Sequence, residues 1–354
     1  MPINYLQMII LYCLDKLNGE RTIYSIYHLL NGKKSSQTIQ DAHLFQLGAL
    51  FQTCPSLERA DLDEKIKHLE KQGLIQEKEE LHYMVTDEGA SALAAQLQKT
   101  PIPSSLNGWK LHDKSALFWE RLSLLVQVVS QLSHNNSHYI PIQRRRAAHI
   151  WLKKALREAK MDKKALAAGL YGELEALLES YRETDPSIIV LRLTGAGHIG
   201  LTSEQAAEAM NFDSDYYRFC FLSILHYLIV RIMEDRSSFP VLRLLFTGEE
   251  SSIPLTQSAQ KTYMMLKQGV CLDKIIQARG LKRSTIEDHI VELALNVEGF
   301  SIDPYVQAEK QELIRSAAMN AESRQLKHIR RLAGGAEYFE IRLVMAKYGD
   351  GNDA

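Results

Sequence analysis

Apolar residues recur at helical spacing along most of this chain, and this periodicity limits its fold more than any other feature. The longest periodic segments are 115–133, 142–159, 164–182 and 214–234. Such spacing places the apolar side chains on one face of a helix. Only LIQEK (74–78) and LHYMVT (81–86) alternate in the manner of strands. The sequence therefore predicts a mainly α-helical fold with one small two-stranded hairpin.

Residues 1–98 are predicted to form a winged helix. LQMIILYCLDKLNG, TIYSIYHLL and DAHLFQLGALF have helical patterns, and a fourth helix precedes the hairpin and a closing helix. This order of elements is typical of winged helices. The fourth helix mixes Asp and Glu with Lys, and the hairpin tip is Lys78-Glu79-Glu80, so attraction to phosphates nearly cancels. We therefore expect this part to contact protein rather than to read DNA.

The overall charge of the 354-residue chain is close to zero. A formal net charge of -1 excludes a protein whose whole surface attracts nucleic acid or anionic membrane, so such contacts require a local patch. The four cysteines have neither zinc-site spacing nor the density of a secreted scaffold. The N-terminal segment lacks a basic region and a cleavage site, and the apolar segment 219–233 is too short to span a bilayer. We expect a cytoplasmic protein without signal peptide or membrane span.

The segment GAGHIG (195–200), in the predicted helical middle part (109–245), has the glycine spacing of a dinucleotide-binding turn. That turn functions between a strand and a helix within a parallel sheet. Here helices follow instead. Thr202 to Gln205 form a capping box, and Asp213 and Asp215 lie where they would cap the next helix. We therefore expect an internal helix-turn-helix-like segment and no cofactor; a nucleotide-dependent enzyme is the minor alternative.

Other motifs that carry chemistry are incomplete. His134 and His138 stand four residues apart, but the intervening Asn-Asn-Ser favours a loop and a third metal ligand is missing nearby. NGKKSS (31–36) lacks the first glycine of a phosphate loop and has Lys34 where Ser or Thr belongs. The sequence contains no G-x-S-x-G elbow and no Cys and His signature. We expect neither a metal site nor catalytic activity.

The segment PIQRRRAAHIWLKKALREAKMDKKA (141–165) is strongly basic. As a helix it forms a stripe that contains Arg146, His149, Lys153, Arg157 and Lys160. The side chains able to turn toward a core are Ile142, Ile150, Trp151 and Leu156. A charge run is usually a solvated face, and the alternative is contact with phosphates or with an acidic partner surface. The candidate contact residues are Arg144, Arg145, Arg146, Lys153, Lys154 and Arg157.

Residues 255–347 are predicted to form a helix-turn-helix domain. Its second helix ends at Gly280, LKR makes the turn, and the third helix begins with Ser284 as N-cap. In such a domain the start of the last helix meets nucleic acid, through its amides and its first side chains. The candidate DNA-binding residues are Lys282, Arg283, Ser284, Thr285 and His289. Glu287 and Asp288 oppose affinity, and a protein-docking domain without DNA contact is the alternative.

This C-terminal part resembles the helix-turn-helix domain at the C-terminal end of many RecQ-type DNA helicases. The similarity lies in GVCLDKIIQARGLKRSTIEDHIVEL and in two elements of the tail. Those are Leu326, Lys327 and Ile329, and then Tyr338, Glu340, Ile341 and Arg342. The whole chain further resembles the YpbB family of low-GC Gram-positive bacteria, stand-alone proteins whose gene typically neighbours that of a short RecQ-type helicase.

The resemblance implies an accessory protein that acts on a separate motor, because helicase motor motifs are missing here. Its partners would be a RecQ-type helicase and DNA, bound weakly or selectively for structure, in repair or recombination. A helix-turn-helix transcriptional regulator is the alternative, and it would require a dimer on a palindromic site. The pattern specifies no oligomeric state. Residues 348–354 are expected to form a flexible tail.

Overall fold

The protein is mainly helical, as predicted. The computed structural model describes residues 3–248, 253–321 and 325–348. Within these residues, a single two-stranded antiparallel sheet accompanies the helices. The chain divides into two compact units, one of residues 1–8 with 94–250 and one of residues 9–93 with 251–354. The second unit therefore contains both the hairpin region and the C-terminal helices. Residues 349–354 of the predicted tail lie outside the described part.

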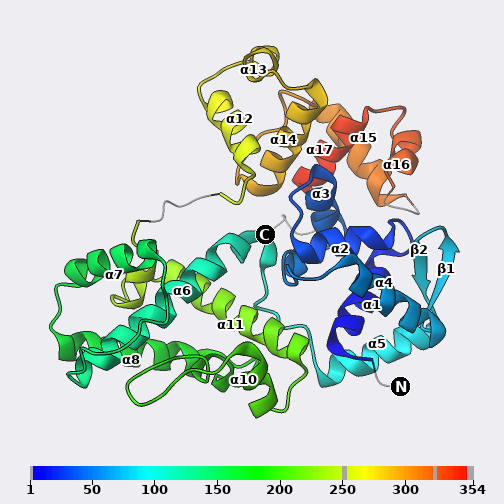
Figure 1. Ribbon diagram of the computed structural model, residues 1–354. Helices are drawn as coiled ribbons and strands as arrows, with labels where there is room; N and C mark the ends of the chain where they lie inside the picture. Colours follow the sequence, from blue (N-terminus) through cyan, green and yellow to red (C-terminus); the bar gives the residue numbers. More distant parts are fainter. Residues whose placement is uncertain (1–2, 249–252, 322–324, 349–354) are drawn as a thin grey trace. The chain divides into compact units, whose positions relative to one another are not determined.

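The N-terminal elements follow the predicted winged-helix order (Figure 1). They are α1 (Tyr5–Leu17), α2 (Ile23–Asn31), α3 (Ser36–Leu44), the 3-10 turn η1 (Gly48–Leu50), α4 (Arg59–Lys71), β1 (Ile75–Glu79), β2 (His82–Val85) and α5 (Asp87–Lys99). The hairpin pairs Ile75 with Val85 and has an irregularity between Glu77 and Glu79. Gly89 lets α5 approach the hairpin closely, because an added Cβ would lie 2.0 Å from the carbonyl oxygen of Leu74.

The position of α3 corrects one prediction. A helix was expected over residues 41–51, but the helix begins at Ser36 and ends at Leu44. Ser35 caps it, accepting a hydrogen bond from the Thr38 amide. The chain then leaves the helical conformation at Gln46, which has a φ of 55°. Because of this local capping, the helix begins about one and a half turns before the predicted start.

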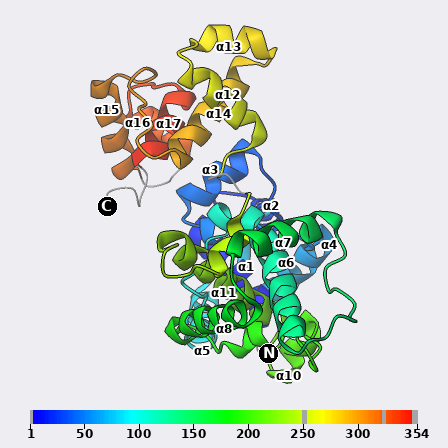
Figure 2. The same cartoon turned by 90° about the vertical axis from the view of Figure 1, so that its left-hand side faces the viewer.

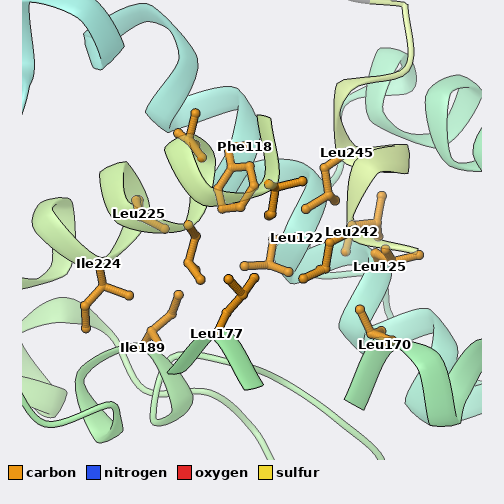
Figure 3. Close-up of a cluster of buried hydrophobic side chains, with 14 of the residues drawn as sticks. Phe118, Leu122, Leu125, Leu170, Leu177, Ile189, Ile224, Leu225, Leu242 and Leu245 are labelled. Atoms are coloured by element: carbon orange, nitrogen blue, oxygen red, sulfur yellow. The ribbon is translucent and has the colours of Figure 1, made fainter. Parts of the chain in front are cut away.

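The middle elements confirm the four long helices that the periodicity predicts. They are α6 (Gly108–Ser133), α7 (Arg146–Ala159), α8 (Lys163–Ser180), α9 (Ser187–Val190), α10 (Ser203–Ala209), α11 (Ser214–Glu234) and the 3-10 turn η2 (Leu242–Phe246). Side chains from α6, α8, α11 and η2, among them Leu122, Leu177, Leu225 and Leu245, meet in the core of the first unit (Figure 3). Leu122 and Leu245 are fully buried.

Helix α11 is the one described helix whose length and hydropathy would allow a membrane span. It has 21 residues, and 61% of its most apolar window is buried inside the molecule. Its side chains Tyr217, Ile224 and Leu228 are fully buried in the core of the first unit. The apolar character of α11 therefore has a packing explanation.

The C-terminal elements are six helices of the second unit, and Figures 1 and 2 show α14 beside α17. They are α12 (Gln257–Lys267), α13 (Leu272–Arg279), α14 (Arg283–Asn296), α15 (Ala308–Met319), α16 (Leu326–Leu332) and α17 (Tyr338–Tyr348). Ile290, Leu293, Ile314 and Ile341 are fully buried between these helices. Helix α3 also packs against α14 and α17.

Candidate nucleic-acid interface

Three helices form the predicted helix-turn-helix. Helix α13 ends at Gly280, whose φ of 60° is the left-handed conformation that glycine adopts without strain. Helix α14 starts three residues later. Ile275 of α13 and Ile286 of α14 are fully buried, while Ile276 and Leu281 are partly buried. The short turn between α13 and α14 is therefore fixed by core side chains on both sides of it.

The residues at the start of α14 are largely solvent-exposed. Lys282, Arg283 and Ser284 are exposed and Thr285 is partly buried. The N-cap is Lys282 rather than the predicted Ser284, so Ser284 already lies in the first turn. Lys282 provides no side-chain cap to this turn. The amides at this end of the helix therefore face outward beside two cationic side chains, an arrangement that suits a phosphate.

His289 does not belong to this edge, which corrects the prediction. Its side chain is buried inside the domain, and its Nδ1 lies 2.9 Å from the Thr262 hydroxyl of α12. Burial, together with the Arg279 guanidinium, lowers the pKa of His289. A side chain buried inside the domain does not reach a phosphate at the surface. The burial of His289 could not be predicted from the sequence, because an amphipathic pattern does not distinguish a buried His from an exposed one.

The acidic residues near the edge are partly compensated. Arg342 of α17 lies 2.6 Å from Asp288, and the two side chains are only 19% and 28% exposed. Arg283 pairs with Asp273 at 2.5 Å, but both side chains are largely exposed, so the pair adds little stability and can open. Burial raises the pKa of Glu287. Asp288 therefore opposes phosphate binding less than its position in the sequence suggests.

Two buried polar contacts, which the sequence reasoning missed, hold α12 against its neighbours. Arg279 donates to the Ser258 carbonyl and to the Thr262 hydroxyl, both at 2.6 Å. Glu292 of α14 accepts from the backbone amide of Thr256 and, at 3.0 Å, from its hydroxyl. The Arg279 contacts join α12 to α13, and the Glu292 contacts join the N-cap of α12 to α14. No spacing rule could have identified them, because each links residues at least 17 positions apart.

The tail elements that carry the RecQ-type resemblance have structural roles here. Ile329 and Ile341 are buried in the domain core. Glu340 accepts a hydrogen bond from the Glu337 amide at 2.8 Å and pairs with Lys310 of α15. Arg342, besides pairing with Asp288, donates to Gln40 of α3 at 2.8 Å. This arginine therefore connects α14, α17 and α3 within the second unit.

The second predicted contact region is the basic helix of the first unit. Arg144, Arg145 and Arg146 are exposed, and so are Lys153, Lys154 and Arg157. The helix begins at Arg146 rather than at residue 142. Trp151 is buried as predicted, and Leu156 is partly buried. Ile142 and Ile150 were expected to turn toward the core, but they are 40% and 59% exposed.

Several backbone amides of the GAGHIG loop already donate hydrogen bonds within the protein, which argues against a pyrophosphate site. Gly195 donates to the His198 carbonyl at 3.0 Å, Ala196 to the Ser130 hydroxyl, and Gly200 to the Thr194 hydroxyl. Thr202 and Gln205 make the predicted capping box, and Asp213 alone caps α11, since Asp215 lies inside that helix. A phosphate cradle needs amides that are not already bonded. Among the described residues, no cluster of His, Cys, Asp or Glu is arranged to hold a metal.

Comparison with known proteins agrees with this description. Residues 258–345 match the family described as helix-turn-helix domain, which spans α12 to α17 almost completely. The chain is 36% identical over 349 residues to Protein YpbB of Bacillus subtilis (strain 168), and the match covers 98% of each chain. No solved structure matches. The chain therefore belongs to the YpbB family.

Proposed function

We propose that this protein is a non-catalytic accessory protein of a RecQ-type DNA helicase, which binds both the helicase and DNA during repair or recombination in the cytoplasm. The observation that carries the DNA-binding part is the exposed start of α14, where Lys282 and Arg283 flank outward-facing amides in a recognised helix-turn-helix domain. Helix-turn-helix domains use this end of the helix to contact nucleic acid.

The charges around α14 favour weak binding that depends on DNA structure. Two cations at the helix start can contact phosphates, which carry no sequence information. Glu287 lies one turn further along, where a sequence-reading helix would place a base-contacting side chain. A carboxylate there repels the backbone. We therefore expect preference for an exposed strand or a fork rather than for one base sequence.

The helicase part of the proposal rests on the resemblance of the C-terminal domain to that of RecQ-type helicases. A motor that lacks this domain could receive it from a separate chain. The exposed basic region of α7 and the winged-helix region are two surfaces through which such a chain could hold its motor. The GAGHIG loop, in which the amides of Gly195, Ala196 and Gly200 are already hydrogen-bonded, is consistent with a protein that leaves nucleotide hydrolysis to that motor.

The DNA-binding part is tested by changing Lys282 and Arg283 together to Ala in the full-length protein. Fluorescence anisotropy with forked, single-stranded and duplex DNA should show weaker binding to all three. If both side chains contact phosphates, the negative slope of log K against log salt should become less steep by about 2. Lys327→Ala with Arg331→Ala is a matched control, since both residues are exposed on α16 of the same domain.

Unchanged binding by the Lys282 and Arg283 variant would exclude a phosphate role for this edge. Strong binding to one palindromic sequence would favour a transcriptional regulator instead. The helicase part is tested separately, by affinity purification of the tagged protein from its own cells. A RecQ-type helicase should be recovered, and the same helicase should unwind forked DNA faster when the purified protein is added.

A further inference from the structure

Helix α7 exposes an isoleucine in the middle of a basic face. Ile150 is 59% exposed. Arg146 lies four residues before it, and Lys153, Lys154 and Arg157 follow it at three, four and seven residues. At 100° per residue, these positions share one side of the helix. The exposed face of α7, defined by these five residues, therefore combines one apolar side chain with four surrounding cations.

The opposite face fixes α7 in the first unit. Ala148, Leu152 and Ala155 are buried there, and the Trp151 indole donates to the Leu244 carbonyl at 3.3 Å. The Arg121 guanidinium lies 5.0 Å from the centre of the Trp151 ring. The buried face is thus already occupied by α6 and η2. Ile150 cannot reach that core without rotation of the whole helix.

The segment before α7 is also held in place. The Gln127 side chain of α6 donates to the Ile140 carbonyl at 3.0 Å and accepts from the Ile142 amide at 2.8 Å. His149 of α7 lies 2.7 Å from the Gln143 carbonyl. This bond places the segment that carries Ile142, itself 40% exposed, against the start of α7. Both isoleucines are therefore presented on hydrogen-bonded backbone.

Few carboxylates balance this surface. Residues 144–164 contain nine Lys and Arg but only two carboxylates, Glu158 and Asp162. Asp162 is engaged as the N-cap of α8, and Glu158 lies 3.8 Å from Lys154. Glu120 lies 3.8 Å from Arg145, which is 82% exposed. The surface is therefore complementary to an acidic partner.

The exposed isoleucines indicate which class of acidic partner fits this surface. A phosphate backbone gains hydrogen bonds and charge from Arg and Lys, but nothing from an exposed isoleucine. A membrane-surface helix needs a broad apolar face, and that of α7 is buried in the core. An acidic protein segment with an apolar side chain would use both features, because Arg is enriched in interface cores beside apolar contacts.

We propose that the exposed face of α7 is a docking surface for an acidic protein segment that carries an apolar side chain between its carboxylates. The cations pair with the carboxylates, and the apolar side chain packs on Ile150. This inference is independent of DNA binding by the helix-turn-helix domain, since α7 belongs to the other compact unit. It would stand even if the helicase proposal failed.

The test compares two short fluorescent peptides on the full-length protein. One places Ile and Leu among Asp and Glu, and the other has Ser at those two positions. The wild-type protein should bind the apolar version roughly tenfold more tightly. Ile150→Ser should remove this difference. Reversal of Arg146, Lys153 and Arg157 to Glu should abolish binding of both peptides.

Matched controls come from exposed residues elsewhere in the first unit. Ile199→Ser removes an isoleucine that is 82% exposed, and reversal of Lys99, Lys110 and Arg236 to Glu makes the same change in net charge. Both should bind the peptides as the wild type does. Failure of both peptides to bind, or equal affinity for the two, would overturn the proposal. So would tighter binding of oligothymidine or phosphatidylglycerol vesicles that the α7 reversal removes.

Discussion

Two buried histidines serve as neutral hydrogen-bond partners at helix junctions. His226 of α11 accepts a hydrogen bond at Nδ1 from the Asn107 amide, 2.9 Å away, at the start of α6. The Nδ1 of His289 in α14 lies 2.9 Å from the Thr262 hydroxyl of α12. Burial lowers the pKa of both imidazoles, and for His226 to about 4. Protonation of His226 at Nδ1 would remove the acceptor of the Asn107 amide, so this contact between α11 and the start of α6 requires the uncharged imidazole.

The lowered pKa of His226 predicts that the first unit loses stability in mild acid. The unfolded chain takes up the proton near pH 6.5, whereas the folded protein resists it down to about pH 4. The contribution of the neutral His226 to the free energy of unfolding is therefore complete above pH 6.5, and it decreases as the pH falls from 6.5 to about 4. Between pH 7 and pH 5 the free energy of unfolding should decrease by about 2 kcal/mol from this residue.

The measurement is urea unfolding followed by tryptophan fluorescence. All three tryptophans, Trp109, Trp119 and Trp151, lie in the first unit, so the signal reports that unit. His226→Asn keeps an acceptor near the Asn107 amide but cannot titrate. Contributions of other groups cancel when the two proteins are compared. An equal loss of stability in wild type and His226→Asn would show that this histidine does not cause the pH dependence.

At the scale of elements, the loop at 195–200 shows how glycine spacing can arise from packing. Gly200 has no positive φ, but an added Cβ would lie 2.3 Å from the Arg192 carbonyl oxygen. Gly197 has a φ of 78° in open space. Gly200 thus permits close backbone approach and Gly197 permits a turn, in a loop that leads into the capped start of α10. At Gly195 an added Cβ would lie 2.9 Å from the Ser130 hydroxyl oxygen.

Gly200→Ala should therefore destabilise the first unit although it is a surface-loop change. The clash is with backbone, which has no rotamer to change, so we expect a loss of about 1–3 kcal/mol in the free energy of unfolding. Gly172→Ala in α8 is the matched control, since no atom lies within 4 Å of its added Cβ. That change should stabilise by up to about 1 kcal/mol. Equal effects in tryptophan-monitored unfolding would contradict the packing explanation.

The sequence predicted helices and caps better than it predicted which side chains meet. The long periodic segments, the hairpin and the Thr202 capping box follow from local patterns, and all are present. Ile150 and Trp151 were both expected in the core because both residue types are apolar, yet only Trp151 lies on the buried face. His289 was expected at the DNA edge because it lies near the start of the third helix of the domain. Both errors concern rotation about a helix axis, which only tertiary packing decides.

At the scale of the molecule, the second unit consists of two segments that are far apart in the sequence. Residues 9–93 and 251–354 belong to one compact unit, although residues 94–250 separate them in sequence. Within that unit, α3 packs on α14 and α17, and Arg342 reaches Gln40 across 302 positions. The winged-helix region and the helix-turn-helix domain are therefore coupled through α3, and the stability of each should depend on the other.

This coupling predicts different effects for its two partners in hydrogen exchange measured by mass spectrometry. Arg342→Ala leaves the half-buried Asp288 without its partner, so exchange should rise roughly tenfold in α14, α17 and α3. Gln40→Ala removes only the bond to α3, so α3 and α17 should exchange faster while α12 and α13 stay unchanged. Arg231→Ala, which loses an exposed pair with Glu234 on α11 of the first unit, is the control.

Unchanged exchange in α3 after either substitution would mean that the two parts of this unit are independent. The coupled result would have a functional consequence, because Arg342 also compensates Asp288, an acidic residue near the start of α14. A ligand that draws α3 away from α17 would leave Arg342 free to hold Asp288 alone. A ligand that displaces Arg342 would expose a carboxylate beside the start of α14 and weaken phosphate binding there. The pair of Arg342 with Asp288, rather than the bond to α3, therefore determines this effect: DNA affinity should stay at the wild-type value in Gln40→Ala and should fall in Arg342→Ala.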